Sequence, residues 1–132
     1  MKLSLLLLLV TSNLALAERH TESAEEMLSA CEGLSTAKIV GDAVALPSDF
    51  ETGKCWGAFS TLYRLSKLVV GQAQGRRDAL PFLPVCSPAE TTTTQYLAIF
   101  VQFSKANPQK LHKEFLVVAI EALTTAFPCA VH

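Results

Sequence analysis

The sequence predicts an all-α fold: a small, disulfide-stapled bundle of four helices, with room for short extra helices, after a cleaved signal peptide. Three observations support this prediction. Apolar residues recur at three- and four-residue intervals in separate stretches, which is the spacing of amphipathic helices. The chain contains four cysteines, an even number that suits an exported, disulfide-bonded domain. The first residues follow the pattern of a secretory signal.

The N-terminal segment predicts a Sec signal peptide over residues 1–17 and one helical domain over residues 18–132. Lys2 precedes an apolar run, and the segment ends in Ala15-Leu16-Ala17, a small-x-small cleavage site. The apolar run is shorter than the roughly 20 residues that span a bilayer, so we expect no membrane insertion after cleavage. A signal of this kind directs the mature protein out of the cytoplasm.

Charge and motif content argue against several classes of function. The net charge of −1 leaves no basic patch for nucleic acid. The three histidines, His20, His112 and His132, do not lie at metal-ligand spacing, and no phosphate loop or Ser-His-Asp set is recognisable. We therefore expect no cofactor, no metal and no catalytic residue, which favours a binding protein over an enzyme.

The first helix is predicted from Ser23 to Gly33. Ser23 and Glu26 have the spacing of a capping box, and Gly33 is a typical helix stop. Residues 34–54 contain several glycine, proline and aspartate turn signals and predict a long connection with one short irregular element around residues 43–46.

The second helix is predicted to begin at Cys55, because an apolar stripe recurs from there to Val70, and to be ended by Gly71 and Gly75. The polar run Gly75-Arg76-Arg77-Asp78 follows it. This run is either a solvated turn or a protruding contact loop, since exposed loops on a rigid scaffold often carry recognition.

The last two helices have proline-based start signals. The third is predicted from Ser87, with Pro88 in the first turn and Glu90 closing a second capping box, to Ala106. The dipeptide Asn107-Pro108 is predicted to start the fourth helix, which runs to Pro128. That helix is apolar on two faces, so it is either the core element or part of a subunit interface.

Four cysteines, Cys31, Cys55, Cys86 and Cys129, allow three sets of two disulfides. The order of the helices favours Cys31–Cys55, joining the first two helices, and Cys86–Cys129, joining the third and fourth if these run antiparallel. The other two connectivities stay open at this stage.

Four short motifs resemble the Rap/Tai family of periplasmic immunity proteins, which protect bacteria from peptidoglycan amidases delivered by type VI secretion. The motifs cover most of the mature chain in the family's order: Met27-Leu28-Ser29-Ala30-Cys31, Cys55-Trp56-Gly57-Ala58-Phe59, Val85-Cys86-Ser87-Pro88, and Ala122-Leu123-Thr124-Thr125-Ala126-Phe127-Pro128-Cys129. The chain departs from the family where Ser60, Leu62 and Tyr63 replace its usual G-Y-x-x-G-x-x-D-like run.

The resemblance implies that the protein binds a cognate amidase and occludes its active-site cleft without performing chemistry. It also implies a helical homodimer, for which the faces of the third and fourth helices are candidate surfaces. The segment that would enter the amidase cleft is residues 72–80, with these expected contacts: Gln72, Gln74, Arg76, Arg77 and Asp78.

The alternative from another class is an exported helical carrier of a small, lipid-like ligand. Four phenylalanines, Phe59, Phe100, Phe103 and Phe115, would either line its cavity or form an ordinary core. A periplasmic hydrolase is a third possibility. An enclosed cavity would favour the carrier, and an apolar patch rimmed by charge would favour the interaction protein.

Overall fold

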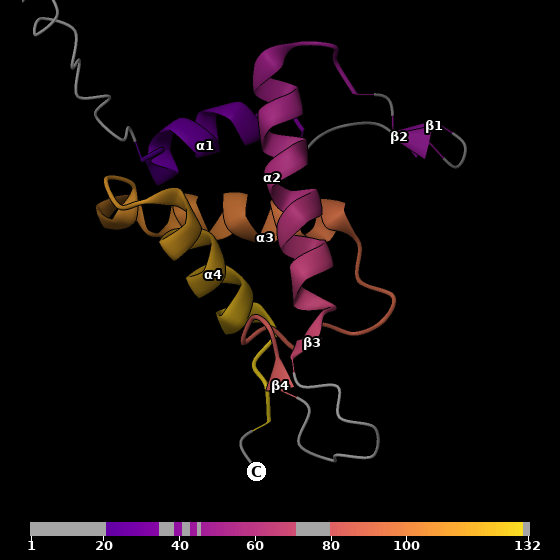
Figure 1. Ribbon diagram of the computed structural model, residues 1–132. Coiled ribbons are helices and arrows are strands. Elements are labelled where there is room, and N and C mark those ends of the chain that lie inside the picture. Colours follow the sequence, from indigo (N-terminus) through magenta and orange to yellow (C-terminus); the bar gives the residue numbers. More distant parts are fainter. Residues whose placement is uncertain (1–20, 35–38, 41–42, 45, 71–79, 131–132) are drawn as a thin grey trace, which may run out of the picture.

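The computed structural model describes residues 21–34, 39–40, 43–44, 46–70 and 80–130, and the predicted signal peptide lies outside them. Within this part of the chain, four α-helices pack around one core (Figure 1): α1 (Ala24–Glu32), α2 (Phe50–Ser66), α3 (Thr93–Ala106) and α4 (Phe115–Ala126). A 3-10 helix, η1 (Pro108–Lys110), precedes α4. Two-residue strands form two antiparallel hairpins, β1 (Ile39–Val40) with β2 (Ala43–Val44) and β3 (Val69–Val70) with β4 (Leu80–Pro81). The predicted all-α class is confirmed.

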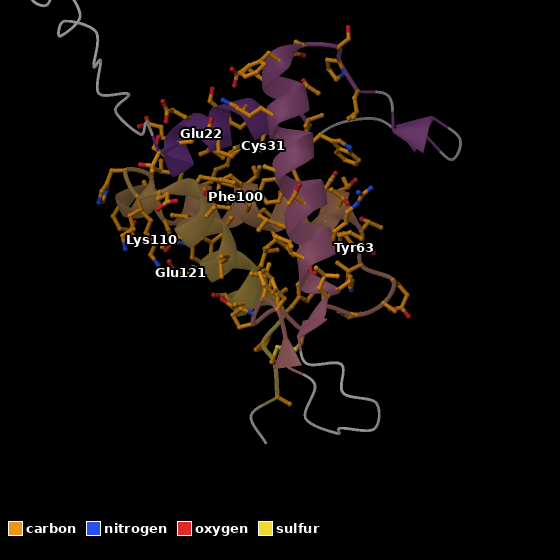
Figure 2. All side chains as sticks on the ribbon, viewed as in Figure 1. Glu22, Cys31, Tyr63, Phe100, Lys110 and Glu121 are labelled. Carbon is orange, nitrogen blue, oxygen red and sulfur yellow. A yellow bond between two sulfur atoms is a disulfide. The ribbon has the colours of Figure 1, made fainter. Side chains whose placement is uncertain are left out.

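Three phenylalanine rings fill the centre of the bundle. Phe59 of α2, Phe100 of α3 and Phe115 of α4 have ring centroids 5.3–5.7 Å apart, in tilted and edge-to-face arrangements. All three are buried, and α3 packs against each of the other helices. Figure 2 shows Phe100 enclosed at the middle of the molecule. Burial of these rings supplies much of the apolar surface that drives folding.

The first helix matches its prediction. The Ser23 hydroxyl accepts a hydrogen bond from the Glu26 N–H at 3.3 Å, and the Glu26 carboxylate accepts one from the Ser23 N–H at 2.8 Å. Gly33 is the C-cap residue. The capping box is readable in the sequence because both of its bonds join residues three positions apart.

The predicted boundaries of the second helix were wrong at both ends. Helix α2 begins at Phe50, inside the predicted 34–54 connection, because Asp49 acts as N-cap and accepts the Thr52 N–H at 2.9 Å. It ends at Ser66 rather than at Gly71, and Val69–Val70 pair with Leu80–Pro81 instead. The predicted irregular element at 43–46 overlaps strand β2.

The predicted start of the third helix was also wrong. Thr92, not Ser87, is the N-cap, and it shares a capping box with Gln95: the two bonds are 3.3 and 2.8 Å long. The hydroxyl of Ser87 is within hydrogen-bond distance of the Lys67 ammonium and the Tyr96 hydroxyl, and no helix starts there. Glu90 therefore closes no capping box.

The fourth helix starts later than predicted. Asn107-Pro108 begins η1, and α4 begins only at Phe115. The intervening carbonyls serve another helix, since Leu111 and Lys113 accept the N–H groups of Glu25 and Ala24 at 3.0 and 2.8 Å. In return, the Phe115 N–H donates to the Glu22 carbonyl at 2.8 Å. Helices α1 and α4 thus satisfy each other's exposed N-terminal backbone groups.

Both disulfides form as predicted, Cys31–Cys55 with a Cα–Cα distance of 5.3 Å and Cys86–Cys129 with one of 4.9 Å. The first joins α1 to α2 in the core, where both residues are fully buried. The second joins the segment before α3 to the chain just after α4. Helices α3 and α4 run antiparallel, because Tyr96, early in α3, stacks on Phe127, which follows α4, at 5.9 Å.

Candidate functional site

The part of the chain that the structure describes holds no metal-binding cluster and no free thiol. No group of three or more His, Cys, Asp or Glu residues in it could hold a metal ion. All four cysteines are in disulfides, so no thiol is left as a nucleophile. Among the described helices, none combines the length and the apolar character that a bilayer crossing requires.

The predicted toxin contacts, Gln72, Gln74, Arg76, Arg77 and Asp78, lie outside the described residues. The structure does place the two strands that lead into and out of that segment. Strands β3 and β4 pair in antiparallel register, with Val69 opposite Pro81 and Val70 opposite Leu80. Figure 1 shows this hairpin at one end of the molecule, beyond the C-terminal end of α2.

Two large apolar side chains are exposed at the base of this hairpin. Leu68 precedes β3 and is 53% exposed, and Phe82 follows β4 and is 54% exposed. The Phe82 N–H donates to the Leu68 carbonyl at 3.0 Å, so the two residues lie side by side. Sequence reasoning missed both, since each is one apolar residue among many. The only sequence feature that could have indicated their exposure is their position, because they flank the polar 72–80 segment.

A group of polar side chains fixes the hairpin base to the core. The Lys67 ammonium donates to the Ser87 hydroxyl at 3.0 Å and to the carbonyls of Ser87 and Pro88 at 3.2 and 3.0 Å. The Ser87 hydroxyl is 2.6 Å from the Tyr96 hydroxyl, which is 2.8 Å from that of Ser66. These contacts tie the end of α2 to the segment that follows β4.

A second surface feature is an open groove of about 290 Å³ where α1, α2 and α4 meet. Lys54 lies in it and forms ion pairs with Glu22 at 2.6 Å and Glu51 at 2.7 Å. Hydrogen bonds from Lys54 to Glu22 and then to Glu51 raise the pKa of that ammonium above 10.5. Leu116 lines the groove and is 46% exposed. The next residue of α4, Val117, is also apolar and is 52% exposed.

The core arrangement bears on the carrier alternative. Three of the four phenylalanines that would line a ligand cavity, Phe59, Phe100 and Phe115, pack against one another and fill the centre of the bundle. Their placement is that of an ordinary core, and it gives the carrier no support.

Comparison with protein families gives a match over most of the chain. The family model of the Rap1a immunity proteins matches residues 23–129, which is most of the 132-residue chain and includes all four helices and both disulfides. No curated protein and no solved structure matches this chain.

Proposed function

This chain belongs to the Rap1a immunity protein family, and from that membership we propose that it neutralises a peptidoglycan amidase delivered by type VI secretion. The predicted resemblance to immunity proteins is confirmed by the family match. An immunity protein acts by binding its cognate effector and catalyses no reaction. The finer statement, that the effector is an amidase and that its cleft is occluded, is the proposal.

The observation that carries the proposal is the hairpin base. Leu68 and Phe82 expose apolar surface, and in the sequence they flank the segment that contains Arg76, Arg77 and Asp78. Buried apolar anchors surrounded by charged or polar groups are the usual composition of a protein-binding surface, in which arginine and aromatic residues contribute most. We propose that this end of the molecule enters the amidase cleft and keeps the peptide substrate out.

The disulfides and the family indicate a location outside the cytoplasm, where disulfides persist. We propose that this location is the periplasm and that residues 1–17 are the signal that directs export. Mass spectrometry of the periplasmic protein tests this, because cleavage after Ala17 makes Glu18 the first residue. An N-terminus that retains Lys2 would contradict it.

We also propose a homodimer that uses the apolar surface of α4. Leu116 and Val117 are consecutive residues of α4 that are 46% and 52% exposed, and burying exposed apolar side chains favours association. Light scattering after size-exclusion chromatography gives the oligomeric state. The pair of changes Leu116→Glu and Val117→Glu should convert a dimer to a monomer, and a wild-type monomer would refute the proposal.

A protection assay tests the main proposal. A candidate peptidoglycan amidase of type VI secretion is expressed in the periplasm with this protein or with one of two variants. The variant Arg76→Ala/Arg77→Ala/Phe82→Ala should lose protection. The control Phe50→Ala removes an aromatic ring that is 78% exposed at the opposite end of α2 and should keep it.

Each outcome has a definite meaning. Protection kept by the triple variant would place the contact elsewhere on the protein. No protection by stably expressed wild-type protein, together with no binding to the purified amidase, would overturn the proposed function.

A further inference from the structure

The polar group at the hairpin base forms one continuous chain of hydrogen bonds. It begins at the Lys67 ammonium, passes through the hydroxyls of Ser87, Tyr96 and Ser66, and ends at the Tyr63 carbonyl. The successive donor–acceptor distances are 3.0, 2.6, 2.8 and 2.7 Å. Tyr96 is fully buried at the middle of this chain.

The direction of every bond follows from the chemistry at the two ends. A carbonyl only accepts, so the Ser66 hydroxyl donates its one proton to the Tyr63 carbonyl and must accept from Tyr96. Tyr96 has then used its proton and accepts from Ser87. Ser87 in turn accepts from the Lys67 ammonium, which can only donate. Each hydroxyl donates once and accepts once, an arrangement in which neighbouring bonds strengthen one another.

The chain connects both sides of the hairpin to the core. Lys67 immediately precedes Leu68, while Ser87 follows Phe82 by five residues and is adjacent to Cys86 of the second disulfide. Tyr96 is held in turn by the rings of Tyr63 at 5.5 Å and Phe127 at 5.9 Å. Lys67 also lies over the Tyr63 ring at 5.4 Å.

We infer that Tyr96 and Lys67 are positioning residues for effector binding, because their hydrogen bonds hold Leu68 and Phe82 in the geometry that the effector meets. This inference rests on the proposed function. Neither residue need touch the effector. Their contribution is to fix the hairpin base before binding, so that less conformational freedom is lost in the complex.

The test uses three variants of the full mature protein. Tyr96→Phe keeps the ring and removes the central hydroxyl. Lys67→Met keeps an apolar side chain of similar length and removes the ammonium. Because Lys67 lies outside the core, this variant still tests the hydrogen-bond chain if Tyr96→Phe folds poorly. Thr52→Val is the matched control: it deletes a largely buried hydroxyl that donates to Asp49 at 2.8 Å, at the opposite end of α2.

Two measurements are made on each variant: affinity for the purified amidase of the protection assay, and amide hydrogen exchange at Phe82, whose N–H is bonded to the Leu68 carbonyl. Tyr96→Phe and Lys67→Met should weaken affinity about three- to tenfold and accelerate Phe82 exchange by a similar factor. Thr52→Val should change neither, although it lowers the melting temperature.

The outcomes separate the two proposals. Unchanged Phe82 exchange in Tyr96→Phe and Lys67→Met would overturn this inference whether or not the amidase binds. Equal losses of affinity in these variants and in Thr52→Val would also overturn it, since general destabilisation would then explain the loss. A wild-type protein that does not bind the amidase would overturn the proposed function, and the exchange data would still decide the role of Tyr96 in the hairpin base.

Discussion

Removal of the buried Cys31–Cys55 disulfide should lower stability by at least about 3 kcal/mol. The perturbation is the double change Cys31→Ala/Cys55→Ala. The two cysteines are 24 residues apart, and closing a loop of that length in the unfolded chain corresponds to about 3.4 kcal/mol at 25 °C. Both side chains are fully buried between α1 and α2, so the lost sulfur contacts add to this figure.

The assay is urea unfolding followed by circular dichroism, with the free energy obtained by linear extrapolation. For a domain of this size, 3.4 kcal/mol corresponds to a fall in melting temperature of roughly 14 °C. The matched control is Cys86→Ala/Cys129→Ala, whose separation of 43 residues corresponds to about 4.0 kcal/mol by the same relation.

The comparison separates chain entropy from packing. If chain entropy dominates, the control loses slightly more stability than the buried pair, although Cys86 is exposed and Cys129 half-buried. A loss below about 1 kcal/mol for Cys31→Ala/Cys55→Ala would refute the reasoning, because neither the closed loop nor the buried contact would then stabilise the fold.

Four further changes test other parts of the structure. Phe100→Ala should cost about 3–5 kcal/mol in urea unfolding, because it empties the centre of the aromatic core. Ser23→Ala should cost about 1 kcal/mol by removing the α1 capping bond, and an unchanged melting temperature would contradict that role. Lys105→Ala should change stability by less than about 0.5 kcal/mol, since its ion pair at 3.0 Å is largely exposed. Hydrogen bonds from the Thr52 N–H and then from the Thr52 hydroxyl hold the pKa of Asp49 below 3.8 in the folded protein. The ionised carboxylate therefore stabilises the fold above that pH. This stabilisation is lost as the pH falls through the pKa that Asp49 has in the folded state. Asp49→Asn should therefore make stability less sensitive to acid below about pH 4, as followed by melting temperature, and an identical pH profile would contradict this.

Local signals in the sequence were sufficient where both partners lie within one turn of helix. The Ser23–Glu26 capping box was predicted correctly for that reason. Asp49 carried a comparable signal, but it lay in a stretch with several turn residues and was interpreted as part of a connection. The order of the helices also favoured the disulfide pairing that the structure shows, out of the three that four cysteines allow.

The predicted helix starts were wrong where the capping hydroxyl or the backbone carbonyl of the predicted helix is bonded to a residue distant in the sequence. Both Ser87 and Thr92 precede a Glu or Gln by three positions, so each is a plausible N-cap. The contacts of the Ser87 hydroxyl are with Lys67, 20 residues away, and with Tyr96, nine residues away, and the helix begins after Thr92 instead. Asn107-Pro108 failed similarly, because the carbonyls that a longer α4 would use are bonded to α1.

The sequence by itself determined the fold class, the cysteine framework, the resemblance to immunity proteins and the absence of a recognisable catalytic set, since these depend on composition, periodicity and short spacings. The tertiary structure decided which of two candidate N-caps starts α3, where α4 begins, and which apolar residues stay exposed. Leu68 and Phe82 are two apolar residues among many in the sequence, and the structure shows that they stay exposed next to the paired strands β3 and β4. The physical reason is that a hydrogen-bonding group or an apolar side chain takes its partner from whatever the fold brings near, and the partners of Ser87, Leu111 and Lys113 are distant in sequence.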